Sequence, residues 1–217
     1  MGRLDWCQNT AWNADVEAAF FAKFARARNK AWYLRIQASW LVPSHPEVAL
    51  QLLDRYFALG ADSSEAEAHF NRGRAYAALG DVDAALAAFE AALAREEAHP
   101  LFRTWAFVEL PALIAVERQS AQYDRAVEVL MRHKDQLTFP VQYYKWHGAL
   151  ALIADAQGRT SEAQGAARQA LDAARTTCSG FRYHPDVGLV ADTSDAFGTR
   201  LKEIAGEAPG KLRWYRR

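Results

Sequence analysis

The chain has 217 residues, of which 51% are hydrophobic, and its 26 Lys and Arg residues balance 26 Asp and Glu residues. This length and composition are typical of a globular protein of one or two domains with a buried core. Because the net charge is zero, nothing attracts the chain in general to nucleic acid or to an anionic membrane, and we expect neither as a partner.

The N-terminal segment, residues 1–29, is predicted to form a capping helix. Asn13 is a suitable N-cap, since its side-chain oxygen can accept from the free N–H groups of the first turn. The apolar residues that follow are spaced to share one helix face, which predicts packing and not a ligand site. They are Val16, Phe20, Phe21 and Phe24.

No export or membrane signal is visible in the sequence. Residues 1–13 lack a charged segment followed by an apolar run, which a secretory signal needs. The chain also has no run of about 18 apolar residues that could cross a bilayer. We therefore expect a cytoplasmic protein.

Residues 66–93, AEAHFNRGRAYAALGDVDAALAAFEAAL, show two amphipathic helical stretches separated by a turn at 79–81. Gly80 can end the first helix because glycine reaches a positive φ without a steric penalty. Asp81 can cap the second helix. The segment is therefore predicted to be a helical hairpin.

This hairpin resembles a tetratricopeptide repeat. It matches the family pattern at five positions, while the usual Trp and Leu positions hold His69 and Arg72 and the closing Pro is displaced to Pro100. The matching residues are Gly73, Tyr76, Ala85, Phe89 and Ala92. The resemblance implies that Gly73 and Ala85 allow close approach of the paired helices, while Tyr76 and Phe89 fill the space between neighbouring repeats.

Three more hairpins are predicted at a similar spacing. Alanines equivalent to Ala85 recur at Ala49, Ala126 and Ala163, at intervals of about 36 to 41 residues. The chain also resembles small stand-alone bacterial proteins of this repeat type, whose role is not settled. The predicted helix pairs are 29–40 with 46–59, 66–79 with 82–93, 100–118 with 123–134, and 141–157 with 161–175.

We thus predict an all-α fold, a right-handed α-solenoid of about four such hairpins with capping helices at both ends. The repeats occupy residues 30–176. Residues 177–217 then hold a loop, a C-terminal capping helix around Leu201 and Ile204, and a basic tail at 211–217 that follows the helix breakers at 209–210.

In the tetratricopeptide family the first helix of each hairpin lines a concave groove, and the resemblance implies that this groove binds a peptide or a partner's surface. Basic residues outnumber acidic residues at the groove positions. This favours an acidic or C-terminal carboxylate ligand held by charge-assisted hydrogen bonds. The predicted partner-binding residues are Arg35, Phe70, Asn71, Arg74, Arg118 and Lys145, and the other groove positions are Leu34, Ala38, Glu67, Ala115, Leu152 and Asp155.

The segment 178–189 is the alternative site, because Cys178, Ser179, His184 and Asp186 crowd together there. A nucleophile with His184 as its base would make the protein an enzyme. We favour an ordered loop instead, in which Phe181, Tyr183, Val187 and Leu189 pack on the last repeat.

The sequence contains no motif for a cofactor, a metal ion or catalysis. It lacks nucleotide-binding glycine motifs, the two cysteines have no metal-binding spacing, and no two of the six histidines fall on adjacent turns of one predicted helix. We therefore predict a non-enzymatic protein-interaction module without cofactor or metal. An immunity protein that neutralises a toxin by tight one-to-one binding, an enzyme built on 178–189, and self-association into a homo-oligomer stay open as alternatives.

Overall fold

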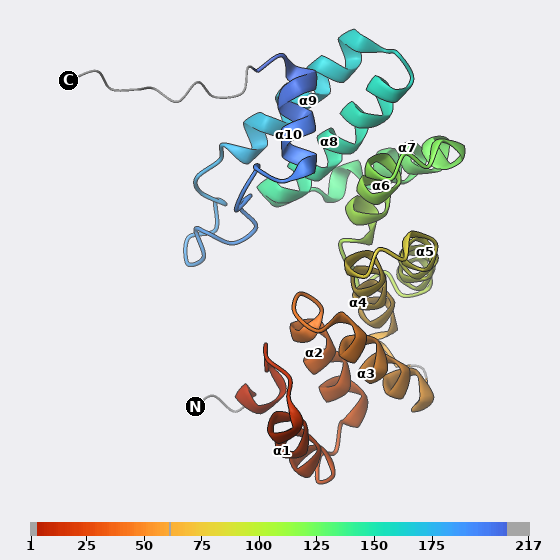
Figure 1. The fold of residues 1–217 in the computed structure, drawn as a ribbon, viewed down its shortest axis with the longest axis vertical. Coiled ribbons are helices and arrows are strands. Elements are labelled where there is room, and N and C mark those ends of the chain that lie inside the picture. The colour runs from red at the N-terminus through yellow and green to blue at the C-terminus, as the bar shows by residue number, and fades with distance from the viewer. Residues whose placement is uncertain (1–3, 61, 208–217) are drawn as a thin grey trace, which may run out of the picture. The chain divides into compact units, whose positions relative to one another are not determined.

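The computed structural model describes residues 4–60 and 62–207, and within these ranges the chain forms ten α-helices and no strand (Figure 1). The described residues are 68% helical, so the predicted all-α helical-repeat fold is confirmed. The chain divides between Ala106 and Phe107 into two compact units, which we call unit 1 and unit 2. None of the helices in the described ranges has both the length and the apolar character that crossing a membrane requires.

Unit 1 consists of a short 3₁₀ turn at Asp5–Cys7 and five helices. The helices α2 and α3 pair as one hairpin, α4 and α5 pair as a second, and α3 also packs on α4. The helix bounds are Ala14–Phe24 for α1, Lys30–Leu41 for α2, Pro46–Ala58 for α3, Glu65–Ala78 for α4 and Val82–Ala98 for α5.

The helix ends in unit 1 follow the predicted capping residues. The side chain of Asn13 accepts from the backbone N–H of Asp15 at 3.1 Å and of Val16 at 3.0 Å. Between α4 and α5, Gly80 has a φ of 76°, and the Asp81 carboxylate accepts from the Ala84 N–H at 3.1 Å. Local capping chemistry therefore sets these boundaries.

The aromatic stripe of α1 is packing, as predicted. Phe20 is 1% exposed, and Phe21 and Phe24 pack against the same core. The ring centroids of Phe20 and Phe24 are 5.8 Å apart. The stripe thus covers the N-terminal end of the core of unit 1.

Gly73 and Phe89 hold α4 and α5 close together. A Cβ atom at position 73 would lie 2.6 Å from two carbons of the Phe89 ring, so only glycine fits there without a shift. Phe89 thus fills space inside its own hairpin, which corrects the expectation that it lies between repeats.

His69 and Arg72, the two departures from the repeat pattern, both contact Phe57 of the preceding hairpin. The His69 and Phe57 ring centroids are 4.6 Å apart, and the Arg72 guanidinium lies 4.3 Å from the Phe57 centroid. Arg72 also forms an ion pair with Asp54. These polar residues therefore join consecutive hairpins. The contact of Gly73 with Phe89 shows that α4 has the predicted alignment with the repeat pattern.

Unit 2 contains five helices and two 3₁₀ turns, Ser120–Gln122 and Lys134–Gln136. The helices α8 and α9 form a hairpin, and α10 packs on both of them. Leu201 and Ile204 of α10 are buried, as expected of a capping helix. The helix bounds are Ala106–Val116 for α6, Tyr123–Arg132 for α7, Pro140–Ala156 for α8, Thr160–Ala174 for α9 and Ala196–Ala205 for α10.

The four equivalent alanines that set the repeat spacing are all buried. Ala49, Ala85 and Ala126 are 0% exposed and Ala163 is 1% exposed. Each lies in the second helix of its predicted pair, where a small side chain allows close helix packing.

The third pair differs from the prediction, since α6 begins at Ala106 and not near Pro100. The preceding segment is tied to the end of α5 through Thr104. The Glu96 carboxylate accepts from the Thr104 N–H at 3.0 Å and from its hydroxyl at 2.5 Å, and Thr104 Oγ1 accepts from the Ala106 N–H at 3.1 Å. Glu96 thus positions the Thr104 hydroxyl to cap α6, and the helix begins at Ala106.

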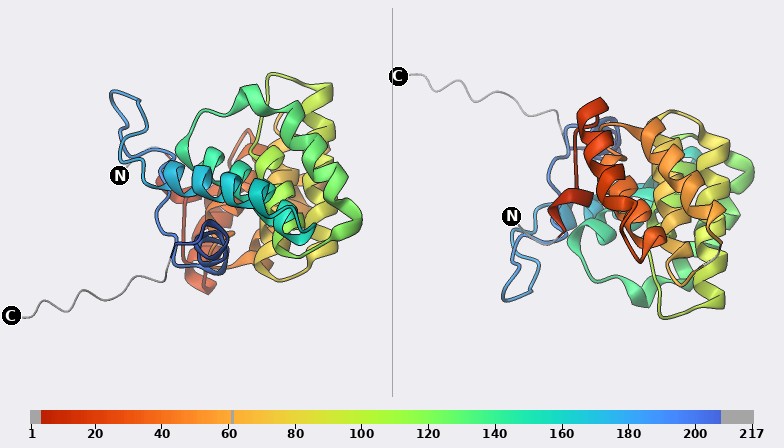
Figure 2. Two further views of the ribbon diagram at one scale, coloured as in Figure 1. Left: turned by 90° about the horizontal axis from the view of Figure 1, so that it is seen from above. Right: turned by 90° about the horizontal axis from the view of Figure 1, so that it is seen from below.

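The segment between α9 and α10 forms a loop that stands out from the helices of unit 2, drawn in blue in Figures 1 and 2. Tyr183 is 79% exposed and Val187 is 45% exposed, so the expectation that both pack on the last repeat is wrong. Phe181 does stack on Phe139, with ring centroids 5.3 Å apart. The helix α10 ends at Gly206, with a φ of 76°. The predicted breakers at 209–210 and the basic tail lie outside the described residues.

Candidate partner-binding pocket

The predicted groove residue Arg35 is used inside unit 1. Arg35 is 9% exposed and forms an ion pair with Glu67, so it links α2 to α4. A second ion pair, between Glu65 and Arg95 at 2.6 Å, joins α4 to α5. The charge of Arg35 is therefore already balanced within the fold.

The other predicted site residues of unit 1 lie on α4. Asn71 is 5% exposed, whereas Phe70 and Arg74 are half-buried. The Arg74 guanidinium lies 5.8 Å from the centroid of the Phe70 ring. Phe70 and Arg74 therefore form a small cation–aromatic surface.

Lys145, a predicted site residue of unit 2, pairs with Glu109 of α6 and so joins α6 to α8. Glu109 was missed by the sequence reasoning. Glu109 is the single acidic residue in the apolar run AFVELPALIAV, and a carboxylate among apolar residues needs a basic partner. This pattern could have indicated an ion pair.

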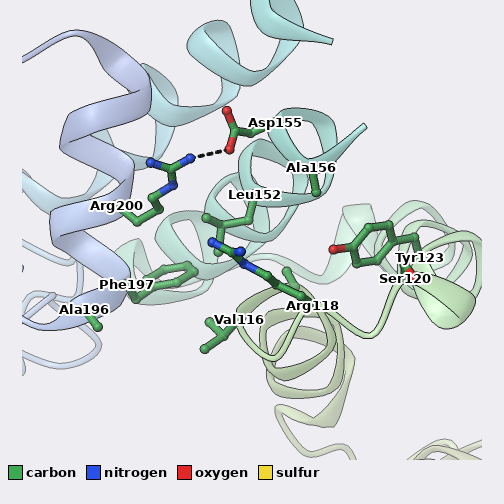
Figure 3. A pocket seen from close by; sticks show the side chains of 11 residues that line it. Val116, Arg118, Ser120, Tyr123, Leu152, Asp155, Ala156, Ala196, Phe197 and Arg200 are labelled. Atoms are coloured by element: carbon green, nitrogen blue, oxygen red, sulfur yellow. Dashed lines mark hydrogen bonds and ion pairs between the residues drawn. The ribbon is translucent and has the colours of Figure 1, made fainter. Parts of the chain in front are cut away.

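Arg118 lies in a pocket of about 570 Å³ in unit 2 (Figure 3). Four predicted groove positions, Ala115, Arg118, Leu152 and Asp155, meet in this pocket. The helix α10, which was predicted only as a capping helix, supplies three more lining residues. The remaining residues that line it are Val116, Ser120, Tyr123, Ala156, Ala196, Phe197 and Arg200.

The backbone of Arg118 has a φ of 52°, the only positive φ of a non-glycine residue in the described ranges. Arg118 follows α6 as Gly80 follows α4 and Gly158 follows α8, and these glycines have φ values of 76° and 73°. An arginine therefore occupies the left-handed position that glycine fills in two other hairpins.

Hydrogen bonds confirm that the three turns are equivalent. In each turn, the amide after the left-handed residue donates to a carbonyl in the last turn of the helix, as in a Schellman motif. These bonds run from Asp81 to Tyr76 at 3.0 Å, from Gln119 to Ile114 at 3.0 Å and from Arg159 to Ala154 at 2.9 Å. A non-glycine residue in this conformation is strained, and such strain is often found where a side chain has a function.

The charges of the pocket leave Arg118 uncompensated. Arg200 donates to Asp155 and to Glu203, both at 2.7 Å, and these bonds raise the pKa of its guanidinium. Arg118 is exposed and forms no ion pair with any described residue. In Figure 3 its guanidinium points into the pocket, beside the apolar side chains of Leu152 and Phe197.

Hydroxyl groups complete the polar side of the pocket. Tyr123 is 5% exposed and directs its hydroxyl toward the pocket, and Ser120 lies next to it (Figure 3). The pocket can therefore hold a group with one negative charge against Arg118, while an apolar portion of the same ligand contacts Leu152 and Phe197.

In the alternative site at 178–189, the Ser179 side chain bonds to the backbone of its own loop. The Ser179 hydroxyl donates to the backbone carbonyl of His184 at 2.8 Å and accepts from the Phe181 N–H at 3.3 Å. It thus closes the loop instead of contacting the His184 imidazole. Among the described residues, no group of His, Cys, Asp and Glu side chains could hold a metal ion.

Comparison with known families supports the repeat assignment. Residues 66–99 match the tetratricopeptide repeat family. No curated protein and no solved structure matches the chain. The matched residues cover α4 and α5, the hairpin in which Gly73 contacts Phe89. Residues 66–99 are therefore identified as a tetratricopeptide repeat, as the sequence predicts.

Proposed function

We propose that this chain is a non-enzymatic protein-interaction module and that the pocket around Arg118 receives an acidic segment of a partner protein. Tetratricopeptide repeats are generally interaction modules, which supports the first part. The second part rests on one observation, an arginine in a left-handed backbone position whose unpaired guanidinium points into a pocket.

The chemistry of the pocket favours a carboxylate next to an apolar side chain. A guanidinium and a carboxylate form charge-assisted hydrogen bonds of about twice the strength of neutral ones. The apolar side chain would rest on Phe197 and Leu152. Because Arg118 is the single uncompensated charge that lines this pocket, one negative charge is the natural complement.

The other predicted partner-binding residues have different proposed roles. Arg35 and Lys145 are balanced by Glu67 and Glu109, so we assign them to holding helices together. Phe70 and Arg74 stay proposed contacts for a partner on unit 1. Asn71 is buried beside them and stays a prediction.

Affinity capture with charge-reversal variants tests the proposal. The wild type, Arg118→Glu and the matched control Arg168→Glu are used to capture partners from a lysate of the source cell, which are identified by mass spectrometry. Arg168 is exposed on α9 and does not line the pocket, so its reversal changes the net charge equally. We expect a partner that binds the wild type and Arg168→Glu and is lost with Arg118→Glu.

A captured partner is then purified, and its dissociation constant is measured by calorimetry. Loss of a close charge pair should weaken binding by at least about tenfold. Equal affinities of the wild type and Arg118→Glu for every captured partner would contradict the pocket assignment. Circular dichroism of both variants checks that the helices are intact.

A further inference from the structure

The loop between α9 and α10 presents a carboxylate beside exposed apolar side chains. Asp186 is exposed and forms no ion pair with a described residue. Val187 follows it in sequence and is 45% exposed, and Tyr183 is 79% exposed. Apolar side chains gathered on a projecting loop are typical of an interaction surface.

This loop is ordered before any partner binds. The Ser179 N–H donates to the Pro185 carbonyl at 2.7 Å, and the Ser179 hydroxyl donates to the His184 carbonyl at 2.8 Å. These two bonds close the tip of the loop on itself. Binding through a loop that is already ordered loses less conformational entropy, which favours affinity.

The base of the loop is fixed to the start of α8. Phe181 stacks on Phe139, and the Val141 N–H donates to the Gly188 carbonyl at 2.9 Å. A Cβ at Gly188 would lie 2.4 Å from the Phe139 ring, so the loop also packs closely there. Both sides of the loop tip are therefore held at the N-terminal end of α8.

The pocket around Arg118 lies at the other end of the same helix, where Leu152, Asp155 and Ala156 line it. Val141 and Asp155 are separated by about 21 Å along α8, given the rise of an α-helix per residue. Because the loop is anchored at Val141, its tip cannot enter the pocket of its own chain. A second copy can supply it.

The loop and the pocket are complementary in charge and polarity. The pocket has one uncompensated cation, Arg118, beside apolar Phe197 and Leu152. The loop offers one unpaired carboxylate, Asp186, directly beside apolar Val187. We propose that the loop of one copy binds in the pocket of a second copy, with Asp186 paired to Arg118.

In the resulting dimer each copy gives one loop and receives the other. A two-fold axis makes the two contacts identical, so the assembly closes at two chains. This inference rests on the pocket of the proposed function and names its occupant as the same protein. Other partners with an acidic segment would then compete with the dimer for the pocket.

Sedimentation equilibrium of the purified full chain tests the dimer over about a hundredfold range of protein concentration. The wild type should pass from one chain to two. Arg118→Glu and Asp186→Arg should each weaken association by at least about tenfold, because like charges then face each other. The double variant, Arg118→Glu with Asp186→Arg, should regain dimerisation, and the control Arg168→Glu should match the wild type.

A labelled synthetic peptide of residues 179–188 gives a second test. It should bind the monomeric Asp186→Arg protein, and the same peptide with Asn at position 186 should bind it at least about tenfold more weakly. A wild type that stays monomeric at every concentration would overturn the proposal. A dimer that is insensitive to both single reversals, or one that the double reversal fails to restore, would overturn it as well.

These outcomes are distinct from those of the proposed function. If the wild type is monomeric but loses a captured partner with Arg118→Glu, the self-association fails and the proposed function stands. If dimerisation follows the charge swap but no other partner depends on Arg118, self-association stands and binding of a foreign segment fails.

Discussion

The ring of Phe89 in α5 lies directly against the backbone of Gly73 in α4, so that a methyl group at position 73 would come within 2.6 Å of two ring carbons. The contact joins the two helices of the repeat at residues 66–99. It explains why a residue with poor helix propensity occupies the middle of α4, since any side chain would force the two helices apart.

Replacing Gly73 by Ala should therefore destabilise the protein. We expect the free energy of unfolding to fall by about 1–3 kcal/mol, as in other overpacked cores. Urea denaturation followed by circular dichroism measures the change. The matched control is Gly165→Ala in α9, where a Cβ would meet nothing within 4 Å. That control should gain about 0.5–1 kcal/mol from helix propensity, and a loss of stability there would contradict the packing argument.

Stability and binding should respond in opposite directions at Arg118. Replacement by Gly relieves the left-handed strain and should raise the free energy of unfolding by about 0.5–1 kcal/mol. The same variant loses the guanidinium and should no longer bind the partner. Arg118→Ala keeps the strain, so its stability should stay within about 0.5 kcal/mol of the wild type while binding is lost. If Arg118→Gly proves less stable than Arg118→Ala, the backbone of residue 118 is not strained.

The ion pair between Arg35 and Glu67 should contribute to folding and not to ligand binding. Arg35→Glu places two carboxylates together where Arg35 is 9% exposed. We expect a loss of roughly 1–4 kcal/mol in the free energy of unfolding, between the values for exposed and buried pairs. The double variant Arg35→Glu with Glu67→Arg should recover most of this loss. If Arg35→Glu leaves stability unchanged but weakens partner binding, Arg35 contributes to binding and not to folding.

Glu96 should make stability depend on pH. Burial raises the pKa of its carboxyl above the usual 4.5, and the hydrogen bonds from Thr104 oppose this rise. As the pH rises above about 4.5, the unfolded chain releases this proton before the folded chain does, so the contribution of Glu96 to stability falls. Glu96→Gln keeps an oxygen acceptor for Thr104 but cannot ionise.

The free energy of unfolding of Glu96→Gln should therefore rise relative to that of the wild type between pH 4.5 and neutral pH. Urea denaturation of both proteins at several pH values measures this difference, in which the other titrating groups cancel. A difference that stays constant, or that shrinks as the pH rises, would show that the folded protein does not raise the pKa of Glu96.

The helices and the repeat spacing could be predicted because their causes are local in sequence. Asn13 and Asp81 cap helices where the sequence predicts, and Gly80 ends α4 with a positive φ. Ala85, the residue that anchors the repeat spacing, is fully buried. Helix formation depends on hydrogen bonds within one or two turns, so periodicity and capping residues determine it.

The candidate site could be predicted only in part. The register of the hairpins indicated that Ala115, Arg118, Leu152 and Asp155 belong to one face, and the structure brings them into one pocket. The register did not predict that Phe197 would line that pocket. Phe197 lies in α10, outside the predicted hairpins, and the sequence does not indicate where α10 packs.

The helical hairpins, their caps and the small residues at their contacts follow from the order of residues along the chain. Which of the basic side chains form ion pairs depends on how the helices pack, since Arg35 and Lys145 pair with carboxylates on neighbouring helices whereas Arg118 does not. The physical reason is that an ion pair between helices depends on the packing of residues far apart in sequence. A helix or its cap depends on a few consecutive residues.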